Sequence, residues 1–62
     1  MYYVVYRMSA KNPLSEIFNS YNDAHKRAKE LAINCDNYDY ITLCKVDNNN
    51  KEQLIRILAS YK

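Results

Sequence analysis

The sequence predicts an α+β domain in which one helix packs on one side of a mostly antiparallel sheet, in the element order ββαββ. Runs of β-branched and aromatic residues occupy both halves of the chain, as is typical of strands. Between them, apolar residues recur at helical spacing. A sheet of three or four strands is the partner that the apolar stripe of a single helix requires.

The first half of the predicted sheet is a hairpin. Residues 2–9, YYVVYRMS, have the composition of a strand. The polar loop that follows contains Pro13, which pushes Asn12 out of the helical region of backbone conformation. Residues 16–19, EIFN, are then expected to pair back as a short second strand.

A helix is expected over residues 20–35. Ser20 is its predicted N-cap, and Asp23 in the first turn complements the helix dipole. One apolar stripe follows helical spacing and consists of Tyr21, Ala24, Ala28, Leu31, Ala32 and Cys35. Because its alanines are small, the helix can lie close to the sheet, with large tyrosines of the strands filling the space between.

The second half of the sheet begins with residues 38–46, YDYITLCKV, as a strand, followed by the polar loop DNNNKE. Residues 51–61 fit two structures, a helix capped by Asn50 or a strand. We favour the strand, because the loop has hairpin length and sequential strands usually pair. The helix is the alternative, and in either case residues 1–62 form a single domain.

The composition excludes several kinds of site. The chain has seven tyrosines and no glycine, which excludes glycine-rich phosphate loops and leaves asparagine and aspartate as the residues that best tolerate left-handed turns. Cys35 and Cys44 lack the close spacing of zinc or redox sites, and one histidine, His25, cannot complete a ligand set. We therefore expect two reduced, buried thiols, no metal and no cofactor.

No catalytic pattern is present in the sequence. His25 is expected at the surface or its boundary, and the carboxylates are scattered with no acid–base pair among them. A domain this small rarely encloses a pocket for a small molecule. The chain is therefore predicted not to be an enzyme and to have no small-molecule substrate.

The predicted location is the cytoplasm. The N-terminal residues lack the basic and apolar regions of a signal peptide. No stretch approaches the roughly 20 apolar residues that a membrane-spanning helix needs, so no membrane partner is expected.

Alternation along the strands sorts their side chains into two faces. We assign the set without cations to the helix-covered core: Tyr2, Val4, Tyr6, Met8, Tyr40, Thr42, Cys44, Val46, Ile55, Ile57, Ala59 and Tyr61. The other set is expected to face water: Tyr3, Val5, Arg7, Ile41, Leu43, Lys45, Leu54, Arg56 and Leu58. Since one helix cannot cover both faces, this second set is predicted to bind protein, either a second copy in a homodimer or a target protein.

Nucleic-acid binding is the alternative function. Lys26, Arg27 and Lys29 form a basic ridge on the exposed side of the predicted helix. Asp23 and Glu30 interrupt this ridge, and the net charge is only +2. The charge pattern therefore indicates weak binding at most.

In its general type, a short, glycine-free and tyrosine-rich chain with one helix, the protein resembles small phage accessory proteins. No motif carries this resemblance. It implies a phage or mobile-element protein that binds and inhibits a host protein, such as a defence protein, in the host cytoplasm. The predicted function is thus a non-enzymatic protein-binding module that acts as a homodimer, with a nucleic-acid-binding or regulatory module as the alternative.

Overall fold

The computed structural model describes residues 1–34 and 39–59. These residues form β1 (Tyr2–Met8), β2 (Leu14–Phe18), α1 (Tyr21–Asn34), β3 (Tyr40–Val46) and β4 (Glu52–Ala59). This order confirms the predicted ββαββ fold class. The C-terminal segment that fitted two structures is strand β4, so the helical alternative is wrong.

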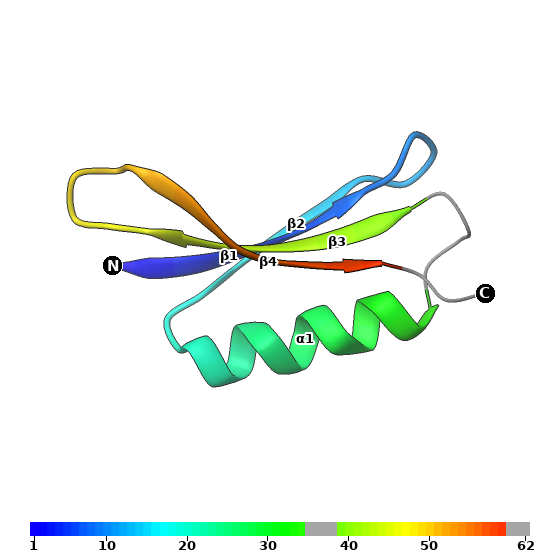
Figure 1. Ribbon diagram of the computed structural model, residues 1–62, viewed down its shortest axis with the longest axis horizontal. Coiled ribbons are helices and arrows are strands. Elements are labelled where there is room, and N and C mark those ends of the chain that lie inside the picture. Colours follow the sequence, from blue (N-terminus) through cyan, green and yellow to red (C-terminus); the bar gives the residue numbers. More distant parts are fainter. Residues whose placement is uncertain (35–38, 60–62) are drawn as a thin grey trace.

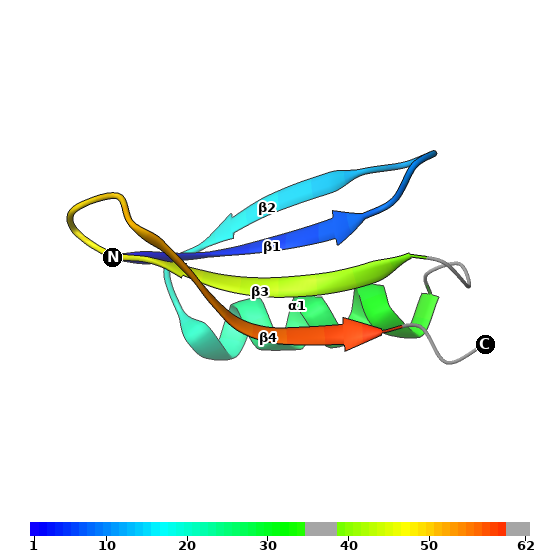
Figure 2. The same cartoon turned by 45° about the horizontal axis from the view of Figure 1, so that its top comes forward.

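The four strands make one sheet in the order β2-β1-β3-β4, and each neighbouring pair is antiparallel. Helix α1 lies along one side of this sheet, as Figure 1 shows. Figure 2 shows the strands side by side, with β2 at one edge and β4 at the other. The other side of the sheet has no helix over it in the described part of the chain.

Polar side chains build the two hairpin turns in place of glycine. In the β1–β2 turn, the Ser9 hydroxyl accepts hydrogen bonds from the backbone N–H groups of Lys11 and Asn12, at 3.3 and 3.1 Å. In the β3–β4 turn, Asp47 Oδ1 accepts from the backbone of Asn49 at 2.8 Å and of Lys51 at 3.0 Å.

The β3–β4 turn also contains the residue in which an asparagine replaces glycine. Asn50 has a φ of 62°, in the left-handed region that asparagine tolerates better than most residues. The absence of glycine from the chain predicted such a substitute, and Asn50 confirms it.

Helix α1 begins as its sequence predicts. Its first residue is Tyr21, and the Ser20 carbonyl accepts the first helical hydrogen bond from Ala24 N at 3.1 Å. The buried residues of α1 are Ala24, Ala28 and Leu31, all from the predicted apolar stripe. Two alanines at the contact let the helix axis approach the sheet closely.

The core lies between α1 and the two central strands. Val5, Ile41 and Leu43 are fully buried there against the helix alanines and Leu31. Each such side chain contributes about 1.5–3 kcal/mol when it is removed from water. Half-buried side chains extend this core around its margin: Tyr3, Leu14, Phe18, Ala32 and Leu58.

This placement shows that the assignment of the two sheet faces from the sequence is wrong. Val5, Ile41 and Leu43 were expected in water and are instead the centre of the core. Conversely, Val4 and Cys44, which were expected beneath the helix, lie on the side of the sheet that α1 does not cover. Cys35 and Tyr61 of the expected core lie outside the described residues.

The positions of the charges explain the error. On the helix side, Arg7 lies near the end of β1, Lys45 near the end of β3, and Arg56 on the edge strand β4. Long side chains at such margins reach water while the centre of the same face stays dry. A charge on one face of a strand therefore does not exclude that face from the core.

A β-bulge in β4 changes which of its residues share a face. Leu43 pairs with Arg56 and Cys44 pairs with Leu54, so Ile55 is an extra residue without a partner on β3. Leu54 therefore lies on the face opposite to Arg56, although simple alternation predicts that they share one. The alternation rule failed here because it has no means of counting an inserted residue.

Candidate protein-binding surface

The surface with the clearest functional potential is the side of the sheet that faces away from α1, which we call the open face. The strand registers assign its residues. They are Tyr2, Val4, Tyr6, Met8, Ser15, Ile17, Tyr40, Thr42, Cys44, Val46, Glu52, Leu54 and Ile57.

An apolar row crosses the centre of the open face through all four strands. Val4 pairs with Ile17 on one side and with Cys44 on the other, and Cys44 pairs with Leu54. The two ends of the row are exposed, Ile17 to 67% and Leu54 to 54%. Val4 and Cys44 between them are almost fully shielded.

Exposed apolar side chains concentrate on this face. Of the nine large hydrophobic residues that are exposed in the described chain, five belong to the open face: Met8, Ile17, Tyr40, Leu54 and Ile57. The half-exposed rings of Tyr2 and Tyr6 lie on the same face. Such a contiguous apolar surface on a small domain is typical of a contact surface for another macromolecule.

The open face has almost no charge. Among the strand residues that the structure describes, Glu52 is its one ionisable carboxylate, and no lysine or arginine lies on it. Its other polar groups are hydroxyls, from Tyr2, Tyr6, Tyr40, Ser15 and Thr42. A surface of this kind can associate through apolar contact and neutral hydrogen bonds without a large desolvation cost.

The Glu52 carboxylate interacts with Tyr6 and Cys44 at the centre of the open face. Hydrogen bonding with the Glu52 carboxylate, aided by partial burial, raises the pKa of Tyr6 to about 12. Burial raises the pKa of the Cys44 thiol, and the same carboxylate adds to that effect. Cys44 is a free, buried cysteine, as expected, whereas Cys35 lies outside the described residues. A protonated, shielded thiol is unreactive, so Cys44 has a structural role.

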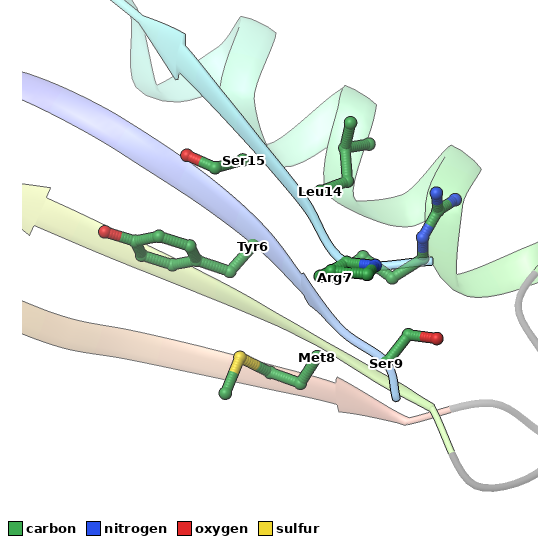
Figure 3. A pocket seen from close by; sticks show the side chains of 7 residues that line it. Tyr6, Arg7, Met8, Ser9, Leu14 and Ser15 are labelled. Carbon is green, nitrogen blue, oxygen red and sulfur yellow. The ribbon is translucent and has the colours of Figure 1, made fainter. Parts of the chain in front are cut away.

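A shallow depression of about 330 Å³ lies at one end of β1 and β2 and is shown in Figure 3. Tyr6, Met8 and Ser15 reach it from the open face, and Arg7 and Leu14 from the helix side. Arg7 is already engaged, because its Nε donates to the Asn12 carbonyl oxygen at 2.8 Å. The depression combines no nucleophile with a general base, so it has no catalytic arrangement.

The residues that the sequence predicted to form one binding surface do not lie together in the structure. Val5, Ile41 and Leu43 are core, and Tyr3 and Leu58 pack against that core. Arg7, Lys45 and Arg56 lie on the helix side of the sheet. Leu54 is the one member of the predicted set that lies on the open face, and it does so because of the bulge.

Sequence reasoning missed the exposed members of the true open face, namely Met8, Ile17, Tyr40 and Ile57. A signal was present in the sequence for β1 and β3. The open sides of these two strands contain tyrosines, whose hydroxyls can bond to water, whereas Val5, Ile41 and Leu43 occupy the strand centres on the opposite side.

Of the three cations predicted to bind nucleic acid, Lys26, Arg27 and Lys29, Arg27 is already paired with carboxylates. Arg27 binds Glu16 through two contacts, Nε to Oε1 at 3.0 Å and Nη2 to Oε2 at 3.1 Å, and it also reaches Glu30 at 3.4 Å. These carboxylates raise the pKa of Arg27 and neutralise its charge locally. Lys26 and Lys29 line a shallow depression of about 350 Å³ with Glu30. Two lysines beside a carboxylate make a weak phosphate site.

His25 is a boundary residue, as expected from the sequence. Its ring stacks on Tyr21 with a centroid distance of 5.6 Å, and its Nε2 lies 3.0 Å from Arg56 Nη1. This contact joins α1 to the edge strand β4. No carboxylate orients the ring in the described residues, so the contact is structural in character.

Within residues 1–34 and 39–59, no three histidine, cysteine or acidic side chains gather into a potential metal site. The helix in this part of the chain is too short and too polar to cross a membrane. No protein-family model, curated protein or solved structure matches the chain.

Proposed function

We propose that the protein is a non-enzymatic protein-binding module whose contact surface is the open face. The proposal rests on one observation, that helix α1 covers only one of the two faces of the sheet in the described part of the chain. Helix α1 buries the aliphatic centre of one face, whereas five large apolar side chains of the other remain in water.

The energy available from this face favours association. Ile17, Leu54 and Ile57 are each more than half exposed. Because full burial of such a side chain is worth about 1.5–3 kcal/mol, each retains about half of that for an interface. The tyrosines add ring area at low entropic cost and hydroxyls for hydrogen bonds at the rim.

The proposed target is a host protein that the module binds and inhibits in the host cytoplasm. Two features support a protein target in preference to a nucleic acid. The open face has no cation to contact phosphates, and on α1 the guanidinium of Arg27 is paired with Glu16. The expected identity of the target as a defence protein rests on the phage-accessory type of the chain.

The test compares two exposed isoleucines that differ in location. Ile17 lies on the open face with 67% exposure, and Ile33 lies on the helix with 72%. Immobilised wild-type protein, Ile17→Lys and Ile33→Lys should be incubated with bacterial lysate, and captured proteins quantified by mass spectrometry. Proteins captured by the wild type should be retained by Ile33→Lys and lost with Ile17→Lys. Equal loss or equal retention in both variants would contradict the proposal.

A further inference from the structure

We infer that the partner of the open face presents an arginine to the Glu52 carboxylate, within a contact surface that is otherwise apolar. This inference rests on the proposed function, since it states the chemistry of the protein that the same face binds. It assigns to Glu52 the role of selecting one partner among the many proteins that have apolar surface.

Glu52 lies among the apolar side chains of the open face. It is the first residue of β4 and pairs with Val46, which pairs in turn with Tyr2. The next row of the sheet on this face contains Cys44 and Leu54. Glu52 and Leu54 are both exposed, and side chains two residues apart on one side of a strand lie about 7 Å from each other. A protein that covers Leu54 therefore also covers the Glu52 carboxylate.

No cation of the described residues forms an ion pair with Glu52. The two ion pairs in residues 1–34 and 39–59 join Arg27 to Glu16 and to Glu30, away from the open face. The N-terminal ammonium, at the same end of the sheet as Glu52, donates to Asn48 Oδ1 at 2.9 Å. A partner without a cation would strip water from the carboxylate and leave its charge uncompensated, which is costly.

The Glu52 carboxylate has acceptor sites left for a guanidinium. The Tyr6 hydroxyl is hydrogen-bonded to this carboxylate, which holds it toward the centre of the face. An ionised carboxylate has about four lone-pair sites, so the bond to Tyr6 leaves others free. Arginine suits the remaining sites, because its planar fork binds carboxylates through two parallel bonds and also stacks on rings such as that of Tyr2. Lysine is more strongly hydrated and lacks this geometry.

The negative charge of the open face disfavours two other occupants. A nucleic acid would bring phosphates toward Glu52, and the described strands supply no cation on this face to hold them. A second copy packed through the same face would bring another Glu52 and again no cation. In a chain of net charge +2, this local anion is complemented by a different protein that has a cation at the matching position.

A peptide-display selection on the purified chain tests the inference. A library of random peptides is selected on immobilised wild type, Ile17→Lys, Glu52→Gln and Glu30→Gln. Peptides that bind the wild type and not Ile17→Lys should contain an arginine among apolar residues. Glu30→Gln, the matched control on α1, should select the same peptides as the wild type. Glu52→Gln should select peptides in which arginine is not enriched.

The affinity of one selected peptide measures the size of the effect. Replacing its arginine by glutamine, or Glu52 by glutamine, should raise the dissociation constant about 10-fold in each case, as for close charge pairs at other interfaces. Both changes together should also raise it about 10-fold, because one interaction is lost only once. Circular dichroism checks folding. If Glu52→Gln unfolds, the peptide change is measured on the wild type, and Glu52→Asp should keep the preference for arginine.

The outcomes separate the inference from the proposed function. Peptides that require Ile17 but show no preference for arginine would overturn the inference and retain the protein-binding module. Multiplying losses in the combined Glu52 and peptide changes would also overturn it, since the two groups would then act independently. Selected peptides that are indifferent to Ile17 would overturn both.

Discussion

Both faces of the sheet have large apolar side chains, but these side chains differ in shape. On the helix side, branched aliphatic residues at the strand centres, Val5, Ile41 and Leu43, meet Ala24 and Ala28 and are fully buried. The open face instead has the rings of Tyr2, Tyr6 and Tyr40, and Tyr6 is hydrogen-bonded to the Glu52 carboxylate. The comparison teaches that fit to the helix, and not the absence of charge, decides which face becomes the core.

The largest expected difference between the faces is in stability. Leu43→Ala should lower the free energy of unfolding by about 2–5 kcal/mol, because it leaves a cavity beneath α1. Ile57→Ala, at a side chain that is 58% exposed, should cost at most about 1 kcal/mol. Urea unfolding followed by circular dichroism at low protein concentration measures both. Similar losses for the two variants would mean that the open face is also core.

A smaller effect is expected at the ion pair that fastens α1 to the edge strand. Glu16→Gln should destabilise the fold slightly, because Arg27 loses its paired contacts in a solvent-screened setting. Ser15→Ala, the neighbour on the open face, is the matched control and should change little. A double-mutant cycle with Arg27→Gln isolates the pair. A coupling energy near zero would show that packing alone holds the helix.

The pH dependence of the free energy of unfolding should reveal the interaction between Tyr6 and Glu52 on the open face. The pKa of Tyr6 is raised from 10.0 to about 12, so the folded state holds the phenol proton more tightly than the unfolded state. The stabilisation of the folded state by the protonated Tyr6 phenol is therefore complete below pH 10 and is lost as the pH rises through about 12. The stability difference between wild type and Tyr6→Phe should shrink across this window.

Glu52→Gln provides the control for that titration. Because the carboxylate is the main cause of the raised pKa, its removal should return the tyrosinate transition of Tyr6 toward the ordinary range. Ring signals in a nuclear magnetic resonance titration follow Tyr6 separately from the other tyrosines. An unchanged transition in Glu52→Gln would assign the shift to burial.

The smallest effect is expected on the outer side of the helix. Affinity for duplex DNA should be weak and should disappear near physiological salt, since few phosphates are neutralised by Lys26 and Lys29. Fluorescence anisotropy at increasing salt measures it. Tight binding that survives such salt and is lost in the Lys26→Glu, Lys29→Glu double variant would favour the nucleic-acid function over the open face.

The sequence predicted the elements because each has a local physical cause. The β-branched runs, the helix start after Ser20 and the asparagine-rich turn depend on a few neighbouring residues, and the structure confirms these three features. The last segment was harder to assign, because its isoleucines and leucines fit the spacing of a helix as well as that of a strand. Its pairing with β3 makes it a strand.

The candidate surface could not be predicted in the same way. Alternation divides a strand into two sets but does not say which set the helix covers. That choice depends on side chains from distant segments, such as Ala24 and Ala28 against Val5 and Leu43. The bulge at Ile55 likewise arises from pairing between strands, and it moved Leu54 to the opposite face.

The strand order also has a consequence for the route of folding. The β1–β2 and β3–β4 ladders join segments that are neighbours in sequence, and each can close quickly. The β1–β3 ladder instead joins Tyr2–Met8 to Tyr40–Val46 across the whole of β2 and α1. The largest single loop-closure cost therefore falls on the β1–β3 ladder. The same ladder brings Val5 to Leu43, so the pairing with the greatest sequence separation also completes the core.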